Sequence, residues 1–192
     1  MTRIAIILGS TRPNRVGDQV ATWVHGIASH RADADFELLD LRDHPLPHLN
    51  EPLPPALGQY QHEHTKAWNR TIDSFDGYIL VTPEYNQSTS AVLKNALDYS
   101  SAEWKTKAVG LVSYGGAGGL GAAAQLRHLC GVLGMADVPE QVVLMLHTEF
   151  ENLKTFKPGD RAAISLTTML EQVVSWSSAL APLREVCEPL RA

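Results

Sequence analysis

The chain has 192 residues, 44% of them hydrophobic, which is enough to bury the core of one domain of ordinary size. Its net charge of -5 argues against a nucleic-acid-binding protein, because such proteins usually carry a basic patch or stripe. Cys130 and Cys187 fit no metal or redox spacing, and no apolar run is long enough to span a membrane. We therefore expect a single cytoplasmic domain over residues 1–192, with no nucleic-acid or membrane partner.

The first part of the chain alternates strand-like and helix-like patterns. Residues 3–9 form a β-branched, apolar run typical of a fully buried strand. Apolar residues then recur at helical spacing over 16–27, and residues 35–41 predict a second strand. The segment 42–58 holds five of the eleven prolines and predicts a long loop, because proline lacks the backbone donor of helices and strands.

The rest of the chain continues this alternation. Five strands that alternate with helices indicate a parallel sheet covered by helices on both faces. The expected fold class is therefore α/β, a three-layer sandwich around a five-stranded parallel sheet. One known arrangement of such a sheet is the flavodoxin-like one, with strand order 2-1-3-4-5. The further elements are a helix at 60–75, a strand from 76 that ends at Pro83, a short helix at 89–99, a strand at 108–114, a helix at 122–133, a strand at 140–146 and a helix at 166–174.

Three loops of unusual composition follow predicted strands. They read GSTRPNRVG at 9–17, TPEYNQS at 82–88 and SYGGAGG at 113–119. Ligands of such sheets bind beyond the carboxyl ends of the strands, where all three loops emerge. In the order 2-1-3-4-5, strands one, three and four are neighbours, so we expect one pocket to collect the three loops.

The first loop has the chemistry of an anion site. Backbone N–H groups between Ser10 and Gly17 and the positive end of the next helix favour an anion. The hydroxyls of Ser10 and Thr11 can donate, and Arg12 and Arg15 supply charge-assisted donors. The alternative is a capped helix start with two solvated arginines. The loop does not have the glycine and lysine order of a Walker A motif.

The second loop suits a flat heteroaromatic ligand. Pro83 fixes the turn, and Glu84, Tyr85 and Asn86 then place an acceptor, an aromatic ring and an amide at the pocket mouth. Its alternative interpretation is an ordinary polar turn.

Glycines in the third loop would let the backbone approach a ligand closely, unless the loop is simply a flexible turn. Residues 116–121 also read G-A-G-G-L-G, a match to the dinucleotide fingerprint. In a Rossmann fold that fingerprint follows the first strand, whereas here it follows the fourth. A Rossmann dinucleotide-binding enzyme is therefore a weaker alternative.

These motifs resemble those of the NADPH-dependent FMN reductase family, flavodoxin-like flavoproteins that include quinone, azo-dye and chromate reductases. The resemblance covers residues from about 3 to about 146 and rests on GSTRPNRVG, EHTKAW, the stretch from DGYILVTPEYN to SYGGAGG, and QLR. It implies hydride transfer from NADPH or NADH to FMN, and onward to a small acceptor such as free flavin, a quinone, an azo compound or a metal oxyanion. It also implies a homodimer or homotetramer.

The resemblance implies the ligand-binding residues as well. The phosphate of FMN would be bound by Ser10, Arg12, Arg15, Val16 and Gly17. The isoalloxazine ring would be bordered by Pro83, Glu84, Tyr85 and Asn86, and the ring and ribityl side completed by Ser113, Tyr114, Gly115 and Gly116. The flavin carries the chemistry of hydride transfer, so no catalytic side chain and no metal ligand is assigned.

Two departures from the family pattern stand out. A proline of the second-loop motif is missing at Thr89–Ser90, which we expect to loosen the start of the short helix. Glycine replaces arginine at Gly121, which removes a cation near the ligand edge or an interface.

Two rival functions remain. A non-enzymatic electron carrier on the same fold would more often show a strongly acidic docking face. A metal site could use His44, His48, His62 and His64, but their spacing lacks a closed four-ligand pattern and favours surface or loop histidines.

Overall fold

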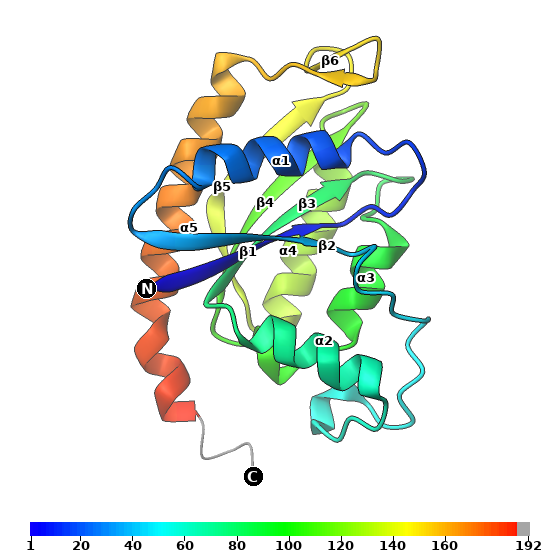
Figure 1. The fold of residues 1–192 in the computed structure, drawn as a ribbon, viewed down its shortest axis with the longest axis vertical. Helices are drawn as coiled ribbons and strands as arrows, with labels where there is room; N and C mark the ends of the chain where they lie inside the picture. The colour runs from blue at the N-terminus through cyan, green and yellow to red at the C-terminus, as the bar shows by residue number, and fades with distance from the viewer. Residues whose placement is uncertain (188–192) are drawn as a thin grey trace.

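The computed structural model describes residues 1–187 and contains the predicted parallel sheet, with strand order β2-β1-β3-β4-β5 (Figure 1). β1 is almost entirely buried, in keeping with its continuous apolar sequence. The strands are β1 (Thr2–Leu8), β2 (Ala34–Asp40), β3 (Gly77–Pro83), β4 (Ala108–Gly115) and β5 (Ala136–Met145).

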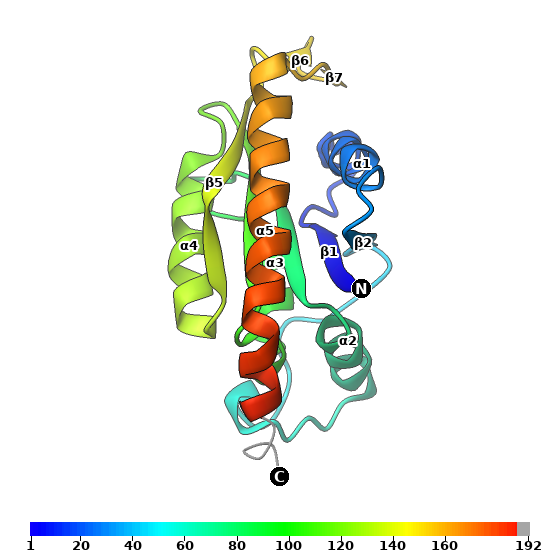
Figure 2. The same cartoon turned by 90° about the vertical axis from the view of Figure 1, so that its left-hand side faces the viewer.

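Helices cover both faces of the sheet. On one face, Val24 of α1 and Met169 of α5 belong to the same buried cluster as Ile6 of β1. Trp68 of α2 and Ile7 of β1 belong to the cluster on the other face, to which α3 and α4 contribute. Figure 2 shows α5 as the long helix that lies over the strands. The helices are α1 (Gly17–Ala28), α2 (Glu63–Asp73), α3 (Ala91–Asp98), α4 (Leu120–Leu133) and α5 (Asp160–Cys187), with short 3-10 turns η1 (Pro55–Leu57) and η2 (Ala102–Trp104).

The last strand and the segment after it differ from the sequence prediction. β5 begins at Ala136, before the predicted start at residue 140, and its pairing with β4 shifts register between Val109 and Leu111. A small unpredicted hairpin follows, made of β6 (Phe150–Glu151) and β7 (Thr155–Phe156). Strands of two residues carry no alternating pattern, so the sequence gives no signal for them.

The proline-rich segment after β2 is a loop, as predicted, and it is held to α3 by one side chain. Asn95 donates from Nδ2 to the carbonyl oxygen of Pro47 at 2.7 Å, and its Oδ1 accepts from the amide of Leu49 at 3.0 Å. Further along, the carboxylate of Glu51 accepts from the amides of Gln61 and His62. The loop is therefore a fixed wall beside α3.

The histidines of this region make loop contacts. The rings of His62 and His64 stack with centroids 5.1 Å apart, and His64 Nε2 lies 3.1 Å from Asn50 Oδ1. Within the described part of the chain, no group of three or more His, Cys, Asp or Glu is arranged to hold a metal ion. Among residues 1–187, no helix is both long and apolar enough to cross a membrane.

Candidate functional site

The loops after β1, β3 and β4 meet at one edge of the sheet, as predicted. Ser10 Oγ of the first loop lies 3.2 Å from the Tyr85 hydroxyl of the second. The amide of Glu84 donates to the carbonyl oxygen of Tyr114, which links the second loop to the third. The parallel strand order thus brings together residues more than 70 positions apart in sequence.

Arg15 of the first loop is buried and paired. Its guanidinium donates to both carboxylate oxygens of Asp40, at the end of β2, and to the carbonyl oxygen of Ser10. The hydrogen bond to Asp40 raises the pKa of Arg15. Burial opposes ionisation of Asp40, but the hydrogen bonds from Arg15 and from the Arg42 amide outweigh it and lower the pKa of that carboxyl. Arg15 is therefore an internal cation rather than a solvated one.

One donor of Arg15 has no partner. Arg15 Nε is buried and makes no hydrogen bond among the described residues. A buried N–H without an acceptor is costly and uncommon in native structures. An acceptor from outside the chain, bound at the first loop, could accept a hydrogen bond from this donor.

Two functional candidates at this loop escaped the sequence analysis. Asp40 anchors Arg15, and Arg42 donates from Nη2 to the carbonyl oxygen of Arg12 at 2.7 Å and from Nε to that of Thr11 at 3.4 Å. The sequence carries a signal for Asp40, because it ends a strand predicted to lie directly beside the first strand. Arg12 itself is exposed, so its charge is available at the surface of the loop.

The start of α1 is shaped for a close approach. Val16 is the N-cap residue and supplies no side-chain acceptor, while the carboxylate of Asp18 in the first turn accepts from the amide of Gln19 at 3.0 Å. A Cβ added at Gly17 would lie 2.3 Å from the Tyr114 hydroxyl. Only glycine therefore lets the first turn of α1 pack against β4.

The second loop turns sharply at its tip. Tyr85 and Ser88 exchange backbone hydrogen bonds, and the two residues between them, Asn86 and Gln87, both have positive φ. This is the pattern of a type I′ turn, which matches the twist of paired strands. The turn leaves the Tyr85 ring partly exposed and the Asn86 side chain in solvent, while Pro83 is buried in the strand.

Glu84 makes a structural contact with the helix that follows the third loop. Its Oε2 accepts from the amides of Gly121 and Ala122, at 2.7 and 3.2 Å. A carboxylate at this position satisfies two donors at the N-terminus of α4 and complements the helix dipole. Glu84 therefore joins the second loop to the helix that follows the third.

The third loop is tightly wound. The Ser113 hydroxyl donates to the carbonyl oxygen of Gly118 at 2.7 Å, and Gly118 and Gly119 both have positive φ. Tyr114 is buried, and that burial raises the pKa of its phenol, which keeps it neutral. A Cβ at Gly116 would meet no atom within 4 Å, so space is open there, whereas one at Gly115 would press on Glu84 and Gly119.

The first departure from the family pattern does not have the expected effect. Ser90 is the N-cap of α3: its hydroxyl accepts from the amide of Leu93 at 3.1 Å and donates to the carbonyl oxygen of Gly9. Thr89 is buried and hydrogen-bonded to Thr82. The prediction of a loosened helix start was wrong, because a serine cap supplies hydrogen bonds that proline lacks.

The second departure has a packing consequence. A Cβ at Gly121 would lie 3.0 Å from the backbone of Gln87 and 2.5 Å from its side chain. Glycine here lets the turn of the second loop pack directly on the first turn of α4. An arginine at this position would require Gln87 to move.

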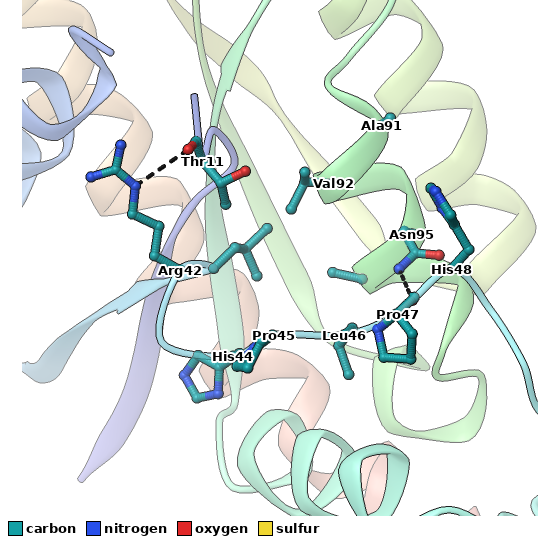
Figure 3. Close-up of a pocket in the computed structure, with 12 residues that line it drawn as sticks. Thr11, Arg42, His44, Pro45, Leu46, Pro47, His48, Ala91, Val92 and Asn95 are labelled. Atoms are coloured by element: carbon teal, nitrogen blue, oxygen red, sulfur yellow. Dashed lines mark hydrogen bonds between the residues drawn. The ribbon is translucent and has the colours of Figure 1, made fainter. Parts of the chain in front are cut away.

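A cavity of about 500 Å³ lies beside the first loop, between the proline-rich segment and α3 (Figure 3). None of the thirteen predicted binding residues lines it. Of the first loop it touches only Thr11. It is therefore a separate hollow that adjoins the site at the sheet edge.

The strand order and the three convergent loops define a flavodoxin-like protein. The sequence pattern of the NADPH-dependent FMN reductases matches residues 2–149, and the chain belongs to this family. It is 43% identical over 146 residues to an NAD(P)H-dependent FMN reductase of Schizosaccharomyces pombe, covering 75% of this chain and 73% of the relative. It is 32% identical over 143 residues to a 2-hydroxy-1,4-benzoquinone reductase of a Burkholderia species, covering 71% and 72%.

Solved structures share the fold. FerB, a flavoenzyme NAD(P)H:(acceptor) oxidoreductase of Paracoccus denitrificans, superposes with a TM-score of 0.72 at 22% identity, covering 93% of this chain and 98% of that one. The predictions of a flavodoxin-like fold and of a flavin-dependent reductase that uses FMN and NAD(P)H are confirmed.

Proposed function

We propose that the three loops at the sheet edge hold FMN, with its phosphate in the first loop. The observation that carries this proposal is the unpaired, buried Nε of Arg15. The exposed guanidinium of Arg12 adds positive charge, and the backbone at Val16 and Gly17, which has no N-cap side chain, adds amide donors around the same point. Ser10 contributes a hydroxyl within 3.2 Å of Tyr85, where the phosphate end passes into the ring end.

The ring end of the proposed site is formed by the second and third loops. The partly exposed ring of Tyr85 and the amide of Asn86 offer an aromatic surface and paired donor and acceptor atoms. The open space at Gly116 allows a flat group to approach the backbone. Pro83, Glu84, Ser113, Tyr114 and Gly115 hold this shape through the contacts described above and border the ring.

FMN supplies the redox chemistry when bound, since it accepts a hydride from NAD(P)H and passes electrons to a second substrate. The chain itself binds FMN, orients it and shields it. Arg12 and Arg15 fix the phosphate, and the second loop fixes the ring plane, so that a nicotinamide can lie against its open face. The neutral phenol of Tyr114 keeps a second negative charge away from the phosphate. No side chain of this chain is assigned a proton transfer.

The acceptor and the assembly are also proposals. The acceptor would be free flavin, a quinone, an azo compound or a metal oxyanion; the relatives are named as FMN, quinone and azo reductases. We propose a homodimer or homotetramer, supported by the exposed apolar side chains of Leu120 and Val132 on α4. A cytoplasmic location is supported by the buried, free Cys130.

The visible spectrum of the purified protein, before and after addition of FMN and NADPH, tests this function. We expect bound-flavin absorbance that NADPH bleaches rapidly under anaerobic conditions in a stopped-flow instrument. Absence of flavin absorbance and of FMN binding at micromolar protein would overturn the proposed site. Binding without fast bleaching would instead favour a non-enzymatic electron carrier.

A further inference from the structure

The cavity beside the first loop has a mainly apolar lining. Figure 3 shows the segment from Pro45 to Pro47 along one side of it and the side chain of Val92, on α3, along another. Its apolar lining comprises Leu41, Pro45, Leu46, Pro47, Val92 and Ala96. Because Asn95 of α3 hydrogen-bonds to the backbone of Pro47 and Leu49, the loop wall and the α3 wall of the cavity are held at a fixed separation. A slot of this size and shape accommodates a planar ring.

The charged lining of the cavity is a single cation. Its lining includes the guanidinium of Arg42 and the imidazoles of His44 and His48, but no aspartate or glutamate. Figure 3 shows the Arg42 guanidinium and the Thr11 side chain together on one side of the gap. A hydroxyl and a guanidinium at the same end of an apolar slot suit a phosphate attached to a ring system.

Arg42 is oriented before any ligand arrives. Two of its five N–H groups donate to the carbonyl oxygens of Thr11 and Arg12, which fixes the plane of the guanidinium. The other N–H groups, including both on Nη1, stay available for an anion. An arginine held in this way loses little side-chain entropy when it binds.

We propose that this cavity binds the adenosine 2′-phosphate end of NADPH, with the 2′-phosphate at Arg42 and Thr11 and the adenine between Leu46 and Val92. The inference rests on the proposed function, in which NAD(P)H reduces a flavin held at the neighbouring loops. Thr11 belongs to the same loop as Arg12, so the cavity opens directly beside the proposed flavin phosphate. The cavity would thereby favour NADPH over NADH.

Calorimetry on the FMN-loaded protein tests the site without turnover. Loading with FMN fills the first loop, so that it cannot capture the added nucleotide. We expect 2′,5′-ADP to bind at least about 10-fold more tightly than 5′-AMP, which lacks the 2′-phosphate. Equal affinity for the two nucleotides would overturn the inference.

Two variants approach the cavity from opposite walls. Arg42→Gln removes the cation, and Val92→Glu adds a negative charge at an exposed position in the first turn of α3, where a carboxylate suits the helix dipole. Val92→Glu should abolish the preference for 2′,5′-ADP and raise the KM for NADPH about 10-fold, with the KM for NADH unchanged. Arg42→Gln should abolish the same preference, and its FMN affinity is measured alongside because Arg42 also holds the first loop. Arg70→Gln, which removes an exposed arginine on α2, is the matched control.

The same samples separate this inference from the proposed function. Flavin absorbance reports FMN binding in each variant, and Val92→Glu leaves the contacts of Arg42 with the first loop intact. If FMN binds and is reduced while both variants keep the preference, the cavity proposal is wrong and the function stands. If FMN does not bind the unaltered protein, the proposed function fails first.

Discussion

Arg15 and Asp40 form a two-pronged ion pair that links the loop after β1 to the end of β2. The Arg15 side chain is 6% exposed and that of Asp40 is 22% exposed. Because Arg15 also donates to the carbonyl oxygen of Ser10, the pair fixes the path of the first loop before any ligand binds. Asp40 is thus a positioning residue for the proposed phosphate site.

Asp40→Asn should therefore destabilise the flavin-free protein. It removes the counter-charge of a buried guanidinium while keeping the side-chain shape, and we expect a loss of about 1–3 kcal/mol in the free energy of unfolding. Urea denaturation at pH 7 measures this loss. An unchanged midpoint and slope would show that the pair contributes nothing to stability.

The pH dependence of that loss follows from the lowered pKa of Asp40. A depressed folded-state pKa gives stability that is present above the unfolded value, near 3.9, and lost as pH falls through the folded value. The difference between the unaltered protein and Asp40→Asn should stay constant from about pH 5 to 7 and shrink below about pH 4. A difference that grows on acidification would contradict this sign.

Arg12→Ala should separate FMN from riboflavin. Arg12 is exposed, so its loss removes charge from the phosphate end without disturbing the fold. We expect FMN affinity to fall about 10- to 100-fold and riboflavin affinity to change little, because only FMN carries the phosphate. Fluorescence titration measures both, with Arg31→Ala as the control. Equal losses for the two ligands would exclude a phosphate contact.

Arg15→Ala should behave differently from Arg12→Ala. Because Arg15 holds Asp40 and Ser10, its loss disturbs the loop itself, and riboflavin affinity and unfolding free energy should fall together with FMN affinity. A loss confined to FMN would assign Arg15 to the phosphate alone. Urea denaturation of the flavin-free variant completes the comparison.

Gly17→Ala should be destabilising, and Tyr114→Phe should rescue it. The added Cβ would lie 2.3 Å from the Tyr114 hydroxyl oxygen, and we expect a cost of about 1–3 kcal/mol in the free energy of unfolding. Removing that oxygen leaves the ring carbon at 3.2 Å and Leu8 Cδ1 at 3.1 Å, close contacts that these side chains must relieve by small shifts, so the rescue should be partial. A double-mutant cycle by urea denaturation measures the coupling, and additive single effects would place the strain elsewhere.

Glu84→Ala should lower the melting temperature of the flavin-free protein more than Glu84→Gln. Alanine removes the acceptor for two amides of α4 and should cost about 1 kcal/mol, whereas glutamine keeps an oxygen and loses only the charge. For a chain of this size, 1 kcal/mol corresponds to about 2–4 °C. Calorimetric melting measures both shifts, and equal shifts would show that the charge dominates.

Alternating apolar periods were sufficient to predict a parallel sheet with three loops at one edge, because the loops after parallel strands emerge at the same side. The strand order came from the flavodoxin-like arrangement and not from the periods. The sequence could not show that Arg15 is committed to Asp40, since pairing within a loop depends on the path of the backbone. It also could not show that Glu84 caps α4. That contact joins residues from two different loops, and no local pattern specifies it.

The starts of α3 and α4 differ in how far the sequence predicts them. The comparison with the family motif concerns the proline missing at Thr89, whereas the start of α3 depends on the hydrogen bonds of Ser90 with Leu93 and Gly9. A serine before a helix is a local signal that could have been found. The tightness of Gly121 against Gln87, in contrast, depends on tertiary packing and has no such signal.

Asn95 engages the loop opposite it much as a neighbouring strand would, with one acceptor and one donor two residues apart along the loop. The segment from Pro47 to Leu49 is therefore expected to move together with α3. If α3 tilts, the loop wall and the helix wall of the cavity move together. The orientation of the cavity then changes, but the distance between these two walls does not. The preference of this cavity for one nucleotide would therefore persist when the helix moves. A site formed by loops that move independently would lose such a preference.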